Sequence, residues 1–290
     1  MASPVVTYDP AASYAVREHD VEYLRIGGRR YLVRVYQPEG TGPFPALLDI
    51  HGGAWSGSDR LTDEVVDRAL AAAGIVVASI DFRSAPEFPY PAQVQDANYA
   101  VRWLKANAEG LGADGTHVGG LGRSSGGHTV FLNALRPRDE RYAAIELSEA
   151  QDADASVAYV IALWPVLDSY TRYLIAKENG ASHLIDASEG YFLTEAAMQE
   201  GNPQGMLDRG EQGLLPPAQI LHGSADTNVP LHLVEHFAEQ YRSAGGQLAL
   251  EVFPGQPHTF AAEASPLTDQ AVALMQGFVA AQVAASYAAT

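Results

Sequence analysis

The sequence predicts an α/β protein whose mostly parallel central sheet is covered by helices on both faces. Short apolar runs alternate along the chain with segments whose apolar residues recur at helical spacing. Strands and helices that alternate in this way form parallel sheets with both faces buried. The chain has 290 residues, of which 47% are hydrophobic, and this is enough for one large core. We therefore expect a single domain over residues 1–290.

The expected elements begin with a hairpin over residues 21–26 and 31–37, which turns at Gly27 and Gly28. Six further apolar runs indicate buried strands, at residues 47–50, 75–80, 117–121, 157–163, 219–222 and 248–253. Two sets of apolar residues each share one helical face, namely Val94, Ala97, Val101 and Leu104, and Leu267, Ala271, Leu274 and Phe278. Ser265 and Pro266 are the start signal of the second helix.

Composition excludes several classes of function. The chain has no cysteine, which excludes disulfides, thiolate metal sites and cysteine nucleophiles. A net charge of -17 argues against nucleic acid and anionic membranes as partners. The first residues show neither a basic start nor an apolar stretch, and no run approaches the ~20 apolar residues of a membrane span. We expect a soluble protein with a cytoplasmic location, and we allow for a homodimer.

Residues 122–126 read Gly-Arg-Ser-Ser-Gly and lie between a strand-like run and a helix-like run. In this setting G-x-S-x-G forms a sharp turn that exposes a nucleophilic serine. We expect side chains at Gly122 or Gly126, which flank Ser124, to clash with the neighbouring strand and helix. The following helix would direct free N–H groups and its positive end toward Ser124, where an oxyanion would form. An ordinary turn is the alternative interpretation of these glycines.

Three further features each follow a predicted strand. Residues 51–55 read His-Gly-Gly-Ala-Trp, a glycine-rich loop whose N–H groups can approach a substrate oxygen. Asp226 follows the run at 219–222, and His258 follows the run at 248–253. Taken alone, Asp226 is typical of a turn or cap and His258 of a surface loop. Together with Ser124 they give the chain order Ser, Asp, His, which is the order of α/β-hydrolases.

The segment at residues 169–216, called the insertion below, separates two predicted strands by more than a simple connection needs. It contains many aromatic and apolar residues, which suggests a helical cap over the catalytic edge of the sheet; a peripheral insertion is the alternative. Asp168 directly precedes it and follows the run at 157–163, where some hydrolases of this fold place the acid. An Asp at the start of a helical segment also serves as an N-cap. We therefore assign the acid to Asp226, 32 positions before His258.

Two other patterns do not carry a function. Residues 110–115 satisfy G-x-G-x-x-G but follow a helix and lead into a strand, the reverse of a dinucleotide fingerprint. Residues 232–236 satisfy H-x-x-E-H, and His232 and His236 would share one face of a helix. The apolar residues around them define the buried face of a crossover helix, and no third ligand is evident. We expect no metal and no cofactor.

The sequence resembles α/β-hydrolases of the hormone-sensitive-lipase-like carboxylesterase group from about residue 20 onward. The resemblance rests on three blocks, residues 51–55, 81–92 with Asp96, and 122–127. It implies Ser124 as nucleophile, Asp226 and His258 as its partners, and oxyanion N–H groups from Gly53, Ala54 and Ser125. The loop reads HGGAW where many members have HGGG, and Arg123 replaces a usually acidic residue. The motif at residues 222–230 is more similar to feruloyl-esterase-like or peptidase-like relatives.

The resemblance and the motifs together predict a serine esterase that acts through an acyl-enzyme intermediate on small or medium uncharged esters. An amidase or formamidase, similar to kynurenine formamidases in the HGGAW loop, would use the same residues. A non-catalytic ligand-binding protein is the third alternative, which an intact triad disfavours. Trp55, Trp164 and Tyr170 are candidate walls of the substrate pocket, although core packing would explain each of them equally well.

Overall fold

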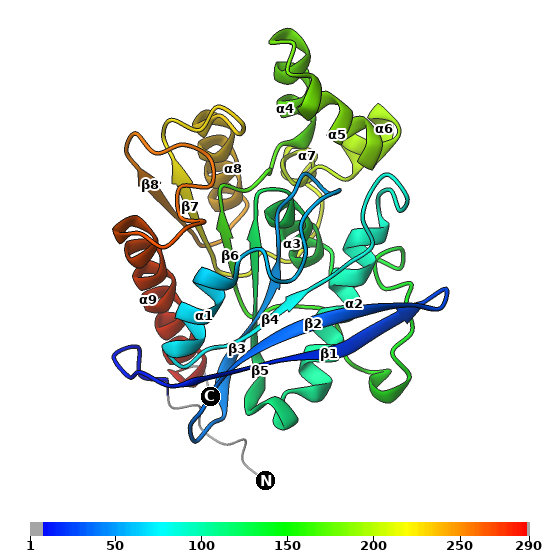
Figure 1. Cartoon of the computed structure of the whole chain (residues 1–290). Helices are drawn as coiled ribbons and strands as arrows, with labels where there is room; N and C mark the ends of the chain where they lie inside the picture. Colours follow the sequence, from blue (N-terminus) through cyan, green and yellow to red (C-terminus); the bar gives the residue numbers. More distant parts are fainter. Residues whose placement is uncertain (1–7, 289–290) are drawn as a thin grey trace.

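The computed structural model describes residues 8–288, which form an eight-stranded sheet. The strand order is β1-β2-β4-β3-β5-β6-β7-β8 (Figure 1). At one edge of the sheet, β1 (Val16–Ile26) and β2 (Arg29–Pro38) are antiparallel to each other, and β2 is antiparallel to β4. The remaining strands are all parallel: β3 (Phe44–Ile50), β4 (Val76–Ile80), β5 (Ala113–Arg123), β6 (Val160–Leu163), β7 (Ala218–Gly223) and β8 (Leu248–Phe253). The predicted fold class is confirmed.

The predicted hairpin is formed by β1 and β2, which turn at Gly27 and Gly28 with φ angles of 58° and 81°. Both angles lie in the left-handed region, which glycine adopts at no steric cost. β1 begins at Val16, earlier than expected, because it pairs with β2 as far as Pro38. Four of the five added residues are polar and only Val16 is apolar, so they lack the apolar pattern of a strand.

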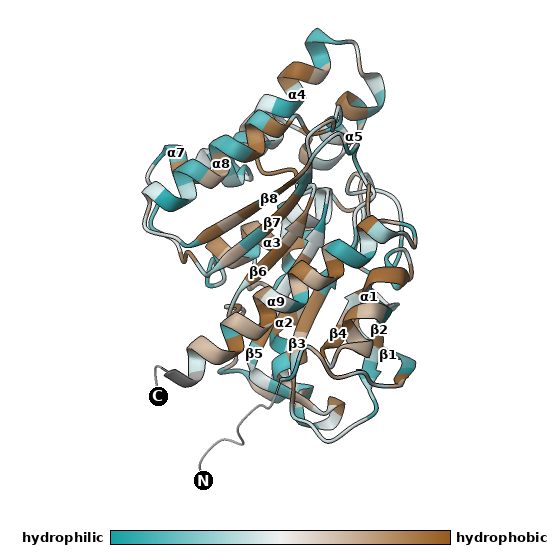
Figure 2. Ribbon diagram, turned by 90° about the vertical axis from the view of Figure 1, so that its left-hand side faces the viewer, coloured by the Kyte–Doolittle hydropathy of each residue, from teal (hydrophilic) through white to brown (hydrophobic). Residues whose placement is uncertain are grey.

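Helices cover both faces of the sheet, as the alternating pattern predicted. One face carries α1 (Glu64–Ala72) and α9 (Pro266–Ala288), and the other carries α2 (Ala92–Asn107), α3 (Ser125–Leu135) and α8 (Leu231–Ser243). Figure 2 shows the strands as a largely hydrophobic layer between these helices. In β3, Leu48 packs on the side of α2 and Leu47 on the side of α1, because successive side chains of a strand point to opposite faces.

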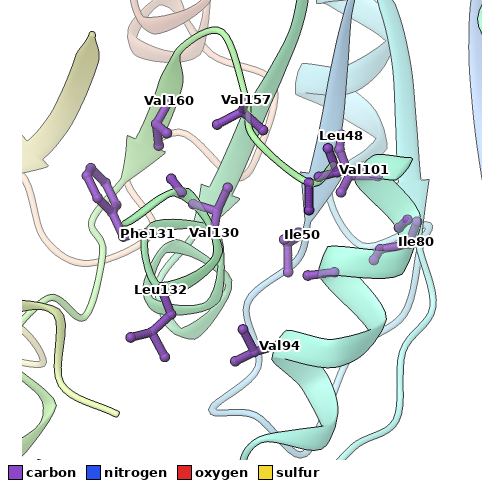
Figure 3. Packing of buried hydrophobic residues seen from close by; sticks show 14 of the residues in the cluster. Leu48, Ile50, Ile80, Val94, Val101, Val130, Phe131, Leu132, Val157 and Val160 are labelled. Atoms are coloured by element: carbon purple, nitrogen blue, oxygen red, sulfur yellow. The ribbon is translucent and has the colours of Figure 1, made fainter. Parts of the chain in front are cut away.

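Branched aliphatic side chains make up much of the core on the α2 and α3 side (Figure 3). Val94 and Val101 of α2 lie over Leu48, Ile50 and Ile80 of the strands. All five side chains are at most 2% exposed. Full burial of one such side chain contributes about 1.5–3 kcal/mol. This core therefore holds β3 and β4 firmly, and the loops that follow these strands start from fixed points.

The insertion between β6 and β7 holds four helices, α4 (Ser169–Glu178), α5 (Ser182–Phe192), α6 (Glu195–Glu200) and α7 (Pro203–Asp208). In Figure 1, α4, α5 and α6 stand beyond the carboxyl ends of the parallel strands. The insertion is fastened to the body of the protein at Tyr191, whose carbonyl accepts from the Tyr90 N–H over 2.8 Å. Within residues 8–288, no helix combines the length and hydrophobicity that a membrane span requires.

Candidate active site

Ser124 occupies the sharp turn between β5 and α3. Its φ and ψ angles are 51° and −117°. Such a conformation costs a residue with a side chain about 1–3 kcal/mol and persists only where its surroundings enforce it. Here the Ser124 N–H donates to the Leu163 carbonyl over 3.0 Å, and the Ser124 carbonyl accepts from the Val166 N–H over 3.0 Å. The neighbouring strand β6 therefore holds the turn in place.

The two glycines that flank Ser124 leave no room for a side chain. A Cβ atom on Gly122 would lie 2.5 Å from the carbonyl oxygen of Gly126. A Cβ atom on Gly126 would lie 1.9 Å from the carbonyl oxygen of Ile50, at the end of β3. Both contacts are with backbone, which cannot move aside. The steric reason expected from the sequence is therefore present in the structure.

His258 links Ser124 to Asp226. Its Nε2 atom lies 3.0 Å from Oγ of Ser124, and its Nδ1 atom lies 2.6 Å from Oδ2 of Asp226. Asp226 follows β7 and His258 follows β8, and these strands are parallel neighbours, so the two loops emerge side by side. Because an ionised carboxylate only accepts hydrogen bonds, Nδ1 carries the proton and Nε2 can accept from the Ser124 hydroxyl. The structure thus joins three sequence-predicted residues in one chain of hydrogen bonds.

The surroundings of Asp226 keep its carboxylate ionised. Burial by itself would raise the pKa of Asp226, but His258 and the N–H of Val229 lower it by more, and the net pKa is below its ordinary value. Oδ1 accepts from the N–H groups of Asn228 and Val229, each over 2.8 Å, so Oδ2 remains for His258. The carboxylate therefore has a fixed orientation and a fixed charge.

The alternative acid, Asp168, lies at the start of α4. Its Oδ1 accepts from the Thr171 N–H over 3.1 Å and from Nδ2 of Asn202 over 2.9 Å. This is the geometry of a helix N-cap, the role that the sequence suggested for it. Asp168 has no hydrogen bond with His258 among the described residues.

The glycine-rich loop after β3 lies against the turn that holds Ser124. A Cβ atom on Gly52 would lie 3.3 Å from Cβ of Ser124. Gly53 and Ala54 both have positive φ angles, 106° and 54°, so the backbone of this loop is neither helical nor extended at these two residues. Within residues 8–288, no protein group accepts from the N–H of Gly53, Ala54 or Ser125. These three amides have the free donors that an oxyanion hole needs.

A cavity of about 470 Å³ opens over Ser124 and His258. Its walls come from the loop after β3, the segment before α1, the insertion, and the loops that hold Asn228 and His258. Trp164, one of the three predicted wall residues, lines it. The insertion contributes Arg172, His183 and Leu184, residues that the sequence analysis did not assign to the site.

Trp55 and Tyr170, the other two predicted wall residues, are not among the residues that line this cavity. Trp55 is 1% exposed; its ring stacks on Tyr191 with centroids 4.9 Å apart, and its Nε1 donates to Nδ1 of His128 over 3.2 Å. It therefore packs beneath the insertion. Tyr170 places its hydroxyl 3.4 Å from Oε2 of Glu195, within the insertion. Apolar composition alone does not separate an aromatic residue in the core from one in a pocket wall.

Arg123, whose role the sequence left open, holds three buried carboxylates together. Its guanidinium forms an ion pair with Asp49 and lies 3.0 Å from Asp67 and 3.3 Å from Asp63. Burial raises the pKa of Asp49 to about 6 and that of Asp67 well above its ordinary value. Burial also acts to lower the pKa of Arg123, but the three carboxylates outweigh it. The three carboxylates therefore hold the buried guanidinium of Arg123 in a fixed position.

His232 and His236 lie on the exposed side of α8. Nε2 of His236 is 3.8 Å from Oδ1 of Asp208. The part of the chain that the structure describes contains no group of three or more side chains suited to hold a metal ion.

The BD-FAE family model matches residues 33–241, more than two thirds of the chain. The chain belongs to the BD-FAE family. The model of the Dienelactone hydrolase family matches residues 201–288, which include Asp226 and His258. The expected resemblance to α/β-hydrolase carboxylesterases is confirmed by these matches and by the similarity of the chain to curated esterases.

Among the curated relatives, "Esterase LipC" of Mycobacterium tuberculosis is 30% identical over 228 residues, which are 76% of this chain and 54% of the relative. "Ethyl acetate hydrolase" of Pseudomonas putida is 29% identical over 257 residues, 83% of this chain and 74% of the relative. The chain spans about half the length of LipC and about half the length of LipM, another M. tuberculosis relative.

Solved structures agree on the fold. A hyperthermophilic esterase from Pyrobaculum calidifontis superposes with a TM-score of 0.75 at 23% identity, covering 91% of this chain and 85% of its own. Esterase 2 of Thermogutta terrifontis superposes with a TM-score of 0.72 at 23% identity, covering 91% of this chain and 94% of its own. The BD-FAE chain therefore has the α/β-hydrolase fold.

Proposed function

We propose that this protein is a serine hydrolase that cleaves carboxylic esters of small or medium size through an acyl-enzyme intermediate. The observation that carries the proposal is the hydrogen-bonded chain from Ser124 through His258 to Asp226 beside a cavity of about 470 Å³. The printed names of the relatives, among them an ethyl acetate hydrolase and a carboxylic ester hydrolase, support it.

In the first step, Nε2 of His258 takes the proton of Ser124 as Oγ attacks the ester carbonyl carbon. The 3.0 Å separation of these atoms is within hydrogen-bond reach. The imidazolium that forms is stabilised by Asp226, 2.6 Å from Nδ1. His258 then donates the proton to the leaving alcohol, and the acyl group stays on Ser124.

The N–H groups of Gly53, Ala54 and Ser125 hold the negative oxygen of the tetrahedral intermediate. One such donor contributes about 3 kcal/mol to the stability of a transition state. The start of α3 at Ser125 adds the positive end of the helix dipole at the same point. In the second step, a water molecule attacks the acyl carbon as His258 takes its proton. His258 then returns this proton to Oγ of Ser124 as the bond to the acyl group breaks and the carboxylic acid leaves. The residues need no cofactor for this chemistry.

Amide or formamide hydrolysis would use the same residues and is the second candidate. The HGGAW sequence of the loop at residues 51–55 is the observation that favours it. The insertion acts as a cap in this proposal, since three of its residues line the cavity. A cytoplasmic location, a homodimer and a single functional domain over residues 1–290 remain predictions.

A panel of p-nitrophenyl esters from acetate to decanoate, with p-nitroacetanilide as the amide, tests the proposal. We expect turnover of the short esters, at least about a hundredfold slower cleavage of the amide, and loss of turnover in Ser124→Ala. Faster cleavage of the amide would favour the second candidate. Absence of turnover for every compound, or full activity in Ser124→Ala, would overturn both.

A further inference from the structure

Arg172 is a buried arginine in the wall of the cavity that holds Ser124 and His258. It lies on α4, the first helix of the insertion, and only 4% of it is exposed. Arginine is seldom buried this completely unless a carboxylate pairs with it. The partners of Arg172 are therefore informative about what the cavity binds.

The protein uses only one edge of the Arg172 guanidinium. Nε donates to the backbone oxygen of Asn228 over 3.0 Å, and Nη2 donates to Oδ1 of the same residue over 2.5 Å. Nη1 is buried and has no hydrogen-bond partner among the described residues. A guanidinium has five N–H donors. Both donors on Nη1 and one on Nη2 remain, and these two atoms form the parallel pair that matches a carboxylate.

No carboxylate in the described part of the chain forms an ion pair with Arg172. Asp226 is the charged neighbour that acts on it, but the oxygens of Asp226 already accept from His258, Asn228 and Val229. Of the two carboxylates in the cavity wall, Asp63 is held by Arg123 and Glu263 is exposed. Burial lowers the pKa of Arg172 to about 10, so the guanidinium stays charged at neutral pH.

A purely structural role does not account for this charge. The contact with Asn228 fastens α4 to the loop of Asp226, but both acceptors are neutral amide oxygens. A neutral donor would satisfy them without the cost of burying a cation. A buried cation that contacts no carboxylate directly, in a cavity beside a nucleophile, indicates that a carboxylate arrives with the ligand.

We propose that Arg172 binds a carboxylate of the substrate, so that the preferred substrates are small esters that carry a free carboxylate. This inference rests on the proposed function and names its substrate class. It departs from the expectation of uncharged substrates, which rested on the net charge of the whole chain and on the apolar composition of the insertion. The local charge of the cavity wall decides which ligand it accepts.

The test compares half-esters with neutral esters of the same shape. Monomethyl succinate, glutarate and adipate each carry one ester and one carboxylate, and their amide analogues replace only the carboxylate. For at least one chain length we expect kcat/KM of the half-ester to exceed that of its amide analogue by at least about tenfold, the size of a charge-assisted bidentate contact. The excess should be mainly in KM.

Two variants remove the free charge in different ways. Arg172→Gln removes the guanidinium, and Asn228→Asp keeps it but places an internal carboxylate at the atom that Nη2 already contacts. In both variants, the ratio of kcat/KM for the half-ester to kcat/KM for its amide analogue should fall to about one or below. Arg172→Lys should retain part of it. If Arg172 had only a structural role, the variants would lower kcat/KM for both substrates by the same factor and leave the ratio unchanged.

Arg102 offers a matched control. It is buried, it donates to the Asn98 side chain and the Ile145 carbonyl, and it lies on α2 outside this cavity. Arg102→Gln should leave the ratio unchanged. If wild type shows no preference at any chain length, or if Arg172→Gln keeps the preference, the inference is overturned while ester hydrolysis stands.

A binding measurement separates this inference from the proposed function. Calorimetry with Ser124→Ala should detect tighter binding of the half-ester than of its amide analogue, and this difference should vanish when Arg172→Gln is added. This result supports carboxylate binding even if wild type cleaves no ester, an outcome that would overturn only the proposed function. Equal binding of both compounds would overturn the role of Arg172.

Discussion

The backbone N–H of Trp55 donates a hydrogen bond to Oγ of Ser125 over 3.2 Å. This contact ties the loop of Gly53 and Ala54 to the residue that follows Ser124. The proposed oxyanion donors come from both segments, so this hydrogen bond helps to fix their relative positions. We therefore expect the two adjacent serines to have different roles, a chemical one for Ser124 and a positional one for Ser125.

Ser124→Ala should lower kcat/KM for a p-nitrophenyl ester by at least about ten thousandfold, because it removes the nucleophile. Ser125→Ala should lower it by no more than about tenfold, since it removes the acceptor for Trp55 but keeps the backbone N–H. Steady-state kinetics of the two variants, with circular dichroism to confirm folding, make the comparison. A greater loss in Ser125→Ala than in Ser124→Ala would contradict these roles.

Asp226→Asn should preserve folding and lower kcat by roughly a thousand- to ten thousandfold, because an amide at this position does not hold the required imidazole tautomer. Asp168→Asn is the matched control. It disturbs the cap of α4 and should cost about 1 kcal/mol of stability or less, with kcat within a few fold of wild type. Chemical denaturation and ester kinetics measure both. The assignment of the acid would be wrong if Asp168→Asn were inactive and Asp226→Asn active.

Arg123→Met should lower the free energy of unfolding by about 3–5 kcal/mol, because it leaves three buried carboxylates without their cation. Asp49 and Asp67, whose folded pKa values are already raised, must then hold protons even more firmly. The folded state thus binds more protons than the unfolded state, and the loss should grow as pH rises.

Arg29→Met is the control for Arg123, because it breaks an exposed ion pair with Glu87 and should cost less than about 1 kcal/mol. Urea denaturation at pH 5 and pH 8 measures both variants. An Arg123→Met protein as stable as Arg29→Met at pH 8 would show that the cluster does not depend on its cation.

His128 predicts a stability that depends on pH. Burial lowers its pKa to about 4; its Nε2 donates to the Gly201 carbonyl over 2.7 Å, and its Nδ1 accepts from Trp55. The unfolded histidine, with an ordinary pKa of about 6.5, takes up a proton first as pH falls. Stability should therefore decrease between about pH 6.5 and pH 4, by up to about 3 kcal/mol from this residue.

His128→Gln keeps a donor for Gly201 and removes this titration, so its stability should vary less across the same pH range. His232→Gln, on the exposed face of α8, should follow wild type. Thermal midpoints at half-unit pH intervals measure the difference. Parallel curves for wild type and His128→Gln would contradict the prediction.

The sequence predicted most of the sheet because buried parallel strands are continuous apolar runs between glycine and proline signals. It failed at β1, where the residues before Val21 pair with β2 but are polar except for Val16. Pairing of an edge strand depends on backbone hydrogen bonds, and these leave no hydrophobic pattern. The C-terminal end of β1 at Ile26 was predicted because Gly27 and Gly28 mark the turn that follows it.

In the site, Ser124, Asp226 and His258 were predictable since each follows a strand, and parallel strands bring their carboxyl ends to one edge. The partners of Arg123 were not predictable from the sequence, because Asp49 and Asp67 lie 74 and 56 positions away in the chain. Arg172 gave no signal either. A single arginine in a helix of mixed composition is typical of a solvated surface, and only the structure shows its burial and its unused donors.

The role of Ser124 as nucleophile is tested most directly by mass spectrometry after reaction with diethyl p-nitrophenyl phosphate. The serine that attacks an ester carbonyl also attacks this phosphorus and keeps the diethyl phosphoryl group. We predict one equivalent of adduct, mapped to Ser124, and a proportional loss of esterase activity. An adduct on Ser125 or on any other residue, with Ser124 unmodified, would contradict the central claim.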